Sequence, residues 1–220
     1  AYIRTRTVRG SQQTVTEFEV APGHSNRVRI NRAAPVRARE ALGIARTVLF
    51  SPEDLQLVRG EPAARRRFVD DLAVSLRPAV AGHRNSLLKS MQLRRTGAAS
   101  ADENAMSTLA VWNEQLAEVG SQLLAARFRV LCVLLPQLKR AYAGLTDGSK
   151  DVSLTYESTV FPSVTERGLE HAARMRPEEF KVAILRCFEE RRSEEIERGI
   201  TLVGPHREDI TLLLGGLAVK

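Results

Sequence analysis

The chain has 220 residues, 43% of them hydrophobic and 27% charged, and a net charge of +7 at pH 7. This length allows one domain, or two small ones, with a buried core. The sequence has no run of 18 or more apolar residues and no charged segment leading into an apolar core at its start. We therefore expect a cytoplasmic protein without a membrane span or a secretory leader.

The positive charge is concentrated near the start of the chain. Residues 1–49 hold nine arginines and three glutamates, whereas the other 171 residues hold 24 basic and 23 acidic side chains. Arginine makes up 28 of the 33 basic residues, and its planar guanidinium suits bidentate contacts to phosphate. This segregation favours a surface that binds a polyanion. The alternative is a composition bias that reflects a GC-rich genome.

The first fifty residues predict strands. Alternation over 2–9 and 14–20, with Gly10-Ser11 between, is typical of a hairpin, and a third strand is expected over 27–30. A short helix ended by Gly43 is expected over 35–42, followed by an apolar strand over 44–50. Side chains alternate between the two faces of a strand, so four guanidinium groups are expected on one sheet surface. We predict that these residues contact phosphate: Arg4, Arg6, Arg27 and Arg29.

From Gly60 the pattern becomes helical. A helix that begins at Pro62 is expected to bury Phe68, Leu72 and Leu76, and another helix is expected over 82–92. The segment 94–102 lacks periodicity and is expected to be a mobile loop. The longest predicted element covers 104–142, with a kink or an end at Pro136. Its apolar residues recur at intervals of three and four from Leu109 through Trp112 to Val133, which predicts the seam of a helical hairpin or short coiled coil.

The last third returns to strands. A strand is expected over 152–160, a helix from Pro177 to Phe188, and strands over 200–203 and 210–214 around a Gly-Pro turn. Strands on both sides of a helical middle predict an α+β fold in which a helical domain is inserted into a sheet domain. Cys132 and Cys187 lie in apolar helical segments, which favours buried free thiols in a reducing compartment over a disulfide or a metal pair.

No complete catalytic motif occurs in the sequence. It has no Gly-x-x-x-x-Gly-Lys-Ser/Thr loop to hold a triphosphate and no Gly-x-Ser-x-Gly elbow. Its four histidines and two cysteines lack the spacing of metal ligands. We therefore expect no catalytic residue, no cofactor-binding residue and no metal ligand within this chain, and a small-molecule enzyme is disfavoured.

Three polar clusters remain. Phe50 to Leu55 reads Phe-Ser-Pro-Glu-Asp-Leu, which favours the start of a helix with acids at its N-terminal end. Three consecutive arginines follow Pro62; contact with phosphate, a solvated face, and ion pairs with Asp70 or Asp71 all stay open for them. The segment 204–209 reads Gly-Pro-His-Arg-Glu-Asp and is either a structural turn or a functional loop. The further candidates for DNA contact are Arg65, Arg66, Arg67, His206 and Arg207.

The order of these motifs resembles the RecF family. The resemblance is carried by Phe-Ser-Pro-Glu-Asp-Leu, by Gly-x-Pro-x-x-Arg-Arg-x-Phe-x-Asp from Gly60, by Arg-Asn-Ser-Leu-Leu-Lys from Arg84, by Trp-Asn-x-x-Leu-x-x-x-Gly from Trp112, and by Gly-Pro-His-Arg from Gly204. It covers about residues 47–214, and the basic strands before it fit the same family. The arginine- and alanine-rich composition suggests an actinobacterial member. Two departures are Glu208, where the family usually has Asp, and the short span between Asp71 and Arg84.

The resemblance implies an internal segment of an ABC/SMC-type ATPase. Residues 1–59 would be strands of the ATPase head, 60–198 an inserted helical domain with a long antiparallel hairpin, and 199–220 strands that return to the head. The family implies ATP and Mg²⁺ as cofactors, an ATP-dependent homodimer, DNA and the RecO and RecR proteins as partners, and recombinase loading at single-strand gaps. The Walker A, signature and Walker B motifs of the family are not in this sequence. The alternative is a non-enzymatic helical scaffold whose seam, from Trp112 to Val133, pairs with a partner helix.

Overall fold

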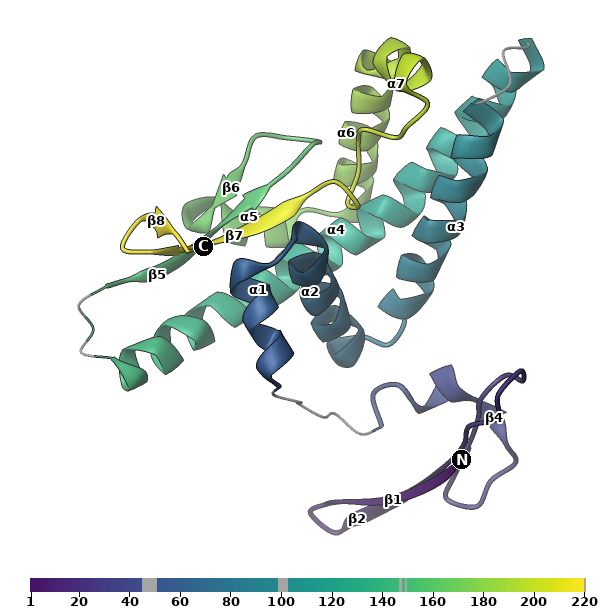
Figure 1. The fold of residues 1–220 in the computed structure, drawn as a ribbon, viewed down its shortest axis with the longest axis vertical. Helices are drawn as coiled ribbons and strands as arrows, with labels where there is room; N and C mark the ends of the chain where they lie inside the picture. The colour runs from purple at the N-terminus through teal and green to yellow at the C-terminus, as the bar shows by residue number, and fades with distance from the viewer. Residues whose placement is uncertain (45–50, 99–102, 147, 149, 220) are drawn as a thin grey trace. The chain divides into compact units, whose positions relative to one another are not determined.

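The computed structural model describes residues 1–44, 51–98, 103–146, 148 and 150–219. The chain forms two compact units. The strand unit comprises Ala1–Phe50 with Val74–Pro78, and the helical unit comprises Ser51–Ala73 with Ala79–Lys220. Figure 1 labels the helices and strands of both units.

The strand unit is an antiparallel meander. Its strands β1 (Tyr2–Arg9), β2 (Gln12–Glu19), β3 (Arg27–Ile30) and β4 (Val36–Arg37) lie in that order. Gly10 makes the first turn with a φ of 61°, in the left-handed region that glycine tolerates. Val28 and Thr16, 1% and 3% exposed, lie on the covered side of the sheet. The predicted hairpin and third strand are confirmed.

The helix expected over 35–42 is only partly formed. A 3₁₀ helix, η1, covers Ala38–Ala41, whereas Val36 and Arg37 are β4 because they pair with Val28 and Arg27. Gly43 has a φ of 84°, consistent with the predicted end of the element. The strand expected over 44–50 lies outside the described residues except for Ile44, which is in a turn.

Helices make up most of the helical unit. They are η2 (Pro52–Leu55), α1 (Gln56–Arg59), α2 (Pro62–Leu76), α3 (Val80–Ala98), α4 (Glu103–Leu145), α5 (Glu166–Arg174), α6 (Pro177–Glu190) and α7 (Arg192–Arg198). The last three residues of α2 are grouped with the strand unit. α3 packs along α4 as the predicted antiparallel hairpin, and α5 and α6 also pack on α4 (Figure 1). α4 continues through Pro136 without ending.

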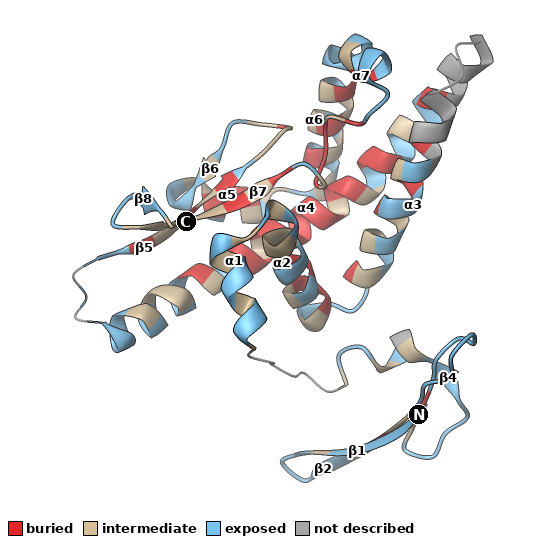
Figure 2. Ribbon diagram, in the orientation of Figure 1, coloured by how far each residue is buried: buried red, intermediate tan, exposed pale blue. Residues whose placement is uncertain are grey.

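α4 is the core helix of its unit. Twelve of the 16 residues from 116 to 131 are buried, and the middle of α4 is largely red in Figure 2. By length and composition the stretch Leu109–Leu145 is apolar enough to cross a membrane, but 61% of its most apolar window is buried inside the protein, as in a core helix. The predicted seam faces the unit's own helices. Leu109, Leu116 and Leu123 are at most 4% exposed, so a partner helix cannot use it, although Val133 is 63% exposed.

The side of α2 that is buried differs from the predicted one. Phe68 and Leu76 are 40% and 48% exposed, whereas Val69, Asp70 and Ala73 are buried. The apolar spacing therefore predicted the helix correctly and its buried face wrongly. The reason is that Asp70 is drawn inward by a buried arginine, Arg127.

The loop expected over 94–102 is helical in its first part. α3 continues to Ala98, and residues 99–102 lie outside the described part. Arg94 is only 4% exposed because its guanidinium bonds to residues of three other segments, which holds the end of α3 in place.

A second antiparallel sheet completes the helical unit. Its strand order is β6 (Val164–Thr165), β5 (Val152–Glu157), β7 (Asp209–Leu214) and β8 (Leu217–Ala218). The rings of Phe128 on α4 and Tyr156 on β5 are 4.6 Å apart and join this sheet to the core. Residues 200–203 are not a strand as expected. Instead the N–H groups of Leu202 and Val203 donate to the Glu195 carboxylate, at 2.6 and 3.3 Å.

Candidate nucleic-acid interface and the ion networks beside it

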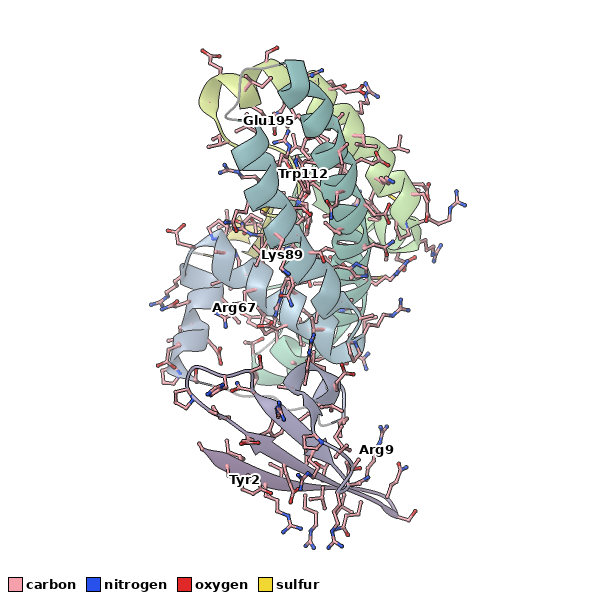
Figure 3. All side chains as sticks on the ribbon, turned by 90° about the vertical axis from the view of Figure 1, so that its right-hand side faces the viewer. Tyr2, Arg9, Arg67, Lys89, Trp112 and Glu195 are labelled. Atoms are coloured by element: carbon pink, nitrogen blue, oxygen red, sulfur yellow. The ribbon has the colours of Figure 1, made fainter. Side chains whose placement is uncertain are left out.

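The four arginines predicted to share a sheet face do so. Arg4 pairs with Glu17, which pairs with Arg29, while Glu19 pairs with Arg27. Directly paired residues point to the same side of an antiparallel sheet, and Arg6 follows Arg4 by two positions. All four arginines are exposed. Figure 3 shows nitrogen-tipped side chains that project from one side of this sheet.

The central strand adds acids that sequence reasoning missed. Glu17 and Glu19 lie between the arginines of β1 and β3, and Arg4 forms an ion pair of 3.5 Å with Glu17. Arg37 on β4 pairs with Arg27 and adds a fifth arginine to the face. Side chains alternate along β2, so this pattern in the sequence could have placed Glu17 and Glu19 on the side of the sheet that carries the arginines. The face, here called the arginine face, thus holds five arginines and two glutamates.

The three consecutive arginines of α2 have different environments. Arg65 makes a bidentate contact with Asp209, through Nε and Nη2 at 2.8 Å each, and Nη1 donates to the Gly60 carbonyl at 2.7 Å. Burial alone would raise the pKa of Asp209, but Arg65, the Ile210 N–H and Arg66 together outweigh burial and lower it. Arg65 is therefore occupied in holding the start of α2 against β7.

Arg66 and Arg67 make fewer polar contacts than Arg65. Arg66 donates from Nη1 to the Glu208 carbonyl at 2.6 Å, and burial together with repulsion from Arg127 lowers its pKa. Arg67 is 83% exposed and lies 3.8 Å from Asp71, one helical turn on. Because an exposed ion pair of this kind is weak, Arg67 is open to another anion.

The segment 204–209 is a turn whose side chains point in different directions. Gly204 has a φ of 122°, and the Arg207 N–H donates to its carbonyl at 2.9 Å. Arg207 is exposed, and its Nε donates to the Thr201 carbonyl at 2.9 Å. His206 Nε2 lies 3.3 Å from the same carbonyl, and burial lowers the pKa of His206 to about 4. His206 is thus neutral at pH 7.

The fold brings two of the predicted clusters together. Arg66, Arg67 and His206 line one pocket with Arg84 of α3, although the cluster in α2 and the 204–209 segment are about 140 positions apart. A neighbouring pocket is lined by His206 and Arg207 with Met91 of α3. Arg84 was part of a motif in the sequence but was not predicted as a contact residue.

A buried ion network lies behind these pockets. Arg127 of α4 holds the Asp70 carboxylate at 2.7 and 3.0 Å and donates to the Pro205 carbonyl at 2.6 Å. The Tyr156 hydroxyl donates to Glu208, and Ser158 donates to the other oxygen of Glu208 at 2.8 Å. Burial raises the pKa of Glu208. This network ties α2, α4, β5 and the 204–209 turn together.

A second buried pair fixes the far end of α3. Arg94 forms an ion pair with Glu195 of α7, both less than 5% exposed, and donates to Thr201 at 2.8 Å. Its guanidinium carbon lies 4.5 Å from the centre of the Phe188 ring, a cation–π distance. Asn113 of α4 accepts a further bond at 2.6 Å.

The segment that begins at Ser51 has a structural role. The segment from Ser51 begins η2 as predicted, and its Asp54 carboxylate accepts the Ser51 N–H at 2.8 Å, which is the structural role that the pattern favoured. Among the described residues no group of three or more His, Cys, Asp or Glu side chains is placed to hold a metal ion. Cys132 and Cys187 are free and half-buried.

Comparisons with known proteins identify relatives along the whole chain. No protein-family model matches it. It is 44% identical over 246 aligned residues to the DNA replication and repair protein RecF of Pseudarthrobacter chlorophenolicus, covering 100% of this chain and 60% of that protein. RecF of Streptomyces avermitilis is 41% identical over 231 residues, with 100% and 58% covered. The chain thus spans about 60% of the length of these relatives.

Two solved structures share the fold of this chain. One described as the recombination mediator protein RecF-ATPrS in the RecFOR pathway has a TM-score of 0.85 at 19% identity, over 99% of this chain and 56% of that one. Another, of RecF-ATP, has a TM-score of 0.82. The fold is therefore α+β with a long helical hairpin, as in the matching part of these RecF structures. Identities of 44% and 41% over the whole chain identify the family within this fold class: the chain belongs to the RecF family.

Proposed function

We propose that this chain is the DNA-contacting segment of a RecF-type recombination mediator. In this proposal the whole protein binds DNA and ATP at single-strand gaps in the cytoplasm and helps to load recombinase in DNA replication and repair. The names of the relatives, which describe DNA replication and repair proteins, support it. So do the solved relatives, whose descriptions name ATP and the RecFOR pathway.

The proposal that this chain contacts DNA rests mainly on the arginine face. Five arginines and two glutamates leave an excess of three positive charges on one side of a small sheet. Residues two positions apart on one strand, such as Arg27 and Arg29, are about 7 Å apart, and β1 lies about 10 Å from β3 because β2 is between them. Long arginine side chains at these spacings can contact several phosphates of one backbone. Arg6, Arg27 and Arg29 are better placed than Arg4, which Glu17 partly neutralises.

In the helical unit we assign phosphate contact to exposed cations. Arg67 and Arg207 are exposed and lie beside adjoining pockets. Arg65 is a structural residue in this proposal, since Asp209 and Gly60 occupy its donors. Arg66 and His206 line the pocket at half-buried positions.

The remaining parts of the proposal concern the longer protein. ATP and Mg²⁺ would bind through residues outside this sequence, because no triphosphate loop occurs in it. We also propose the ATP-dependent homodimer, the RecO and RecR partners, and the division into head strands 1–59, inserted domain 60–198 and returning strands 199–220. The scaffold alternative has lost its main support, since most of its seam is buried inside the unit.

The test is equilibrium binding of labelled DNA to the full chain. Arg27→Gln with Arg29→Gln should weaken binding roughly tenfold at moderate salt, because charge-assisted contacts to phosphate are lost. The control is Arg174→Gln with Arg186→Gln, which removes two arginines that are 80% and 79% exposed. Among the described residues, each forms its ion pair with a glutamate one turn away along its own helix. Equal weakening by both double variants would contradict the assignment to the arginine face.

A further inference from the structure

A pocket of about 420 Å³ lies in the helical unit among α2, α3, α4 and the 204–209 turn. Its size falls within the range of small-ligand sites. Leu87 and Leu88 form apolar parts of its wall. The charged groups that line it are four arginines and one carboxylate: Arg66, Arg67, Arg84, Arg127 and Asp70. Asn85 and the neutral ring of His206 complete its polar wall.

The positive charges of this pocket are incompletely paired. Asp70 holds Arg127, whereas Arg67 and Arg84 share the single carboxylate of Asp71. Within the part of the chain that the structure describes, no carboxylate forms an ion pair with Arg66, whose one hydrogen bond goes to a backbone carbonyl. A half-buried guanidinium that lies near Arg127 and has no carboxylate partner favours an anion beside it.

His206 contributes a neutral ring to the pocket wall. Nε2 faces the Thr201 carbonyl at 3.3 Å, so Nε2 carries the hydrogen of the neutral ring. Nδ1 is buried, has no hydrogen-bond partner among the described residues, and lies beside Gly204, where a Cβ atom would come within 3.4 Å of it. The charge that an anion meets in this pocket therefore comes from the arginines.

We propose that this pocket binds a single phosphate group. Arg66, Arg67 and Arg84 donate to the phosphate oxygens. The proposal rests on the proposed function for Arg66 and Arg67 and adds Arg84. It also changes the kind of contact, because a concave pocket takes one phosphate group rather than a continuous backbone. The source of the phosphate is either a phosphorylated strand end or a free phosphate compound.

The experiment measures thermal unfolding of the full chain in inorganic phosphate and in chloride at equal ionic strength. Phosphate should raise the unfolding midpoint, because a ligand that binds only the folded state stabilises it. Arg66→Gln and Arg84→Gln should each weaken phosphate binding about tenfold. The control Arg174→Gln, an exposed arginine of α5, should leave it unchanged. Arg84 is 34% exposed, so its variant tests the site even if Arg66→Gln fails to fold.

A second measurement compares oligonucleotides of one sequence that end in phosphate or in hydroxyl. Tighter binding of the phosphorylated form, lost in Arg84→Gln, identifies a strand end as the source. Equal binding of both forms together with a phosphate effect on stability identifies a free compound. Phosphate stabilisation that both pocket variants retain, or no stabilisation, contradicts the site. Failure of the chain to bind any DNA contradicts the proposed function and leaves the phosphate result intact.

Discussion

His206 illustrates how one residue can make stability depend on pH. Its pKa in the folded protein is about 4, against about 6.5 for an unperturbed histidine. Between these values the unfolded chain binds the proton more strongly, so the free energy of unfolding falls as the pH drops from 6.5 toward 4. The contribution of neutral His206 to stability is fully present above pH 6.5.

We therefore expect wild-type protein to lose about 2 kcal/mol more than His206→Gln between pH 7.5 and pH 5. Denaturant unfolding at the two pH values measures both losses. The variant is the control for other groups, among them Asp209, whose pKa is lowered, and Glu208, whose pKa is raised. Equal losses in the two proteins would show that His206 does not remain neutral in the folded state.

Arg94 allows a second test at the scale of single residues. Arg94→Met leaves Glu195 buried without its cation, which should lower the free energy of unfolding by about 3 to 5 kcal/mol. Adding Glu195→Gln should restore part of this loss, because an amide oxygen still accepts the N–H groups of residues 202 and 203. Chemical denaturation measures each variant. A double variant no more stable than Arg94→Met would contradict the assignment of the cost to an unpaired carboxylate.

Contacts between single residues were predictable only where they follow from local pattern. Alternation was enough to place Arg4, Arg6, Arg27 and Arg29 on one face. The role of Arg94 was missed because Glu195 lies 101 positions away and no local signal links them. The pairing of Arg65 with Asp209 was missed for the same reason, over 144 positions.

At the scale of elements, the long helices were the best predicted and the short segments the worst. Apolar periodicity is strong enough over α4 to locate it within a few residues. Residues 200–203 have the composition of a strand, but their N–H groups bond to Glu195 instead of a neighbouring strand. α5 and α7 were not predicted, since they are short and bury few residues.

The Arg127 network predicts that α2, α4 and the strand β7 are energetically coupled. Arg127→Met should reduce hydrogen-exchange protection of β7, because Asp70 and Glu208 lose the cation that links α2 and α4 to the start of that strand. Hydrogen exchange followed by mass spectrometry measures this protection. The control is Arg140→Met, at an exposed position of the same helix. Unchanged protection of β7 in Arg127→Met would contradict the coupling.

At the scale of the whole molecule, charge and fold point to one role. The sequence places its positive excess in residues 1–49, and the fold places most of the strand arginines on one sheet face. Two features lay beyond sequence reasoning: the acids of β2 within that face, which depend on register, and the pocket, which depends on tertiary packing. Both modify the predicted DNA contact rather than replace it.

Salt dependence of DNA binding tests the central claim most directly. Phosphate contacts release counterions, so affinity should fall steeply with salt, with a slope of about −0.9 per contact on duplex DNA. Replacing Arg4, Arg6, Arg27 and Arg29 by Gln should make the slope shallower by up to about 4 units. The control with equal loss of charge replaces exposed helical arginines: Arg174, Arg176, Arg186 and Arg198. A steep wild-type slope that only the sheet variant reduces is the predicted result, and a flat wild-type slope, or equal slopes in all three proteins, would contradict it.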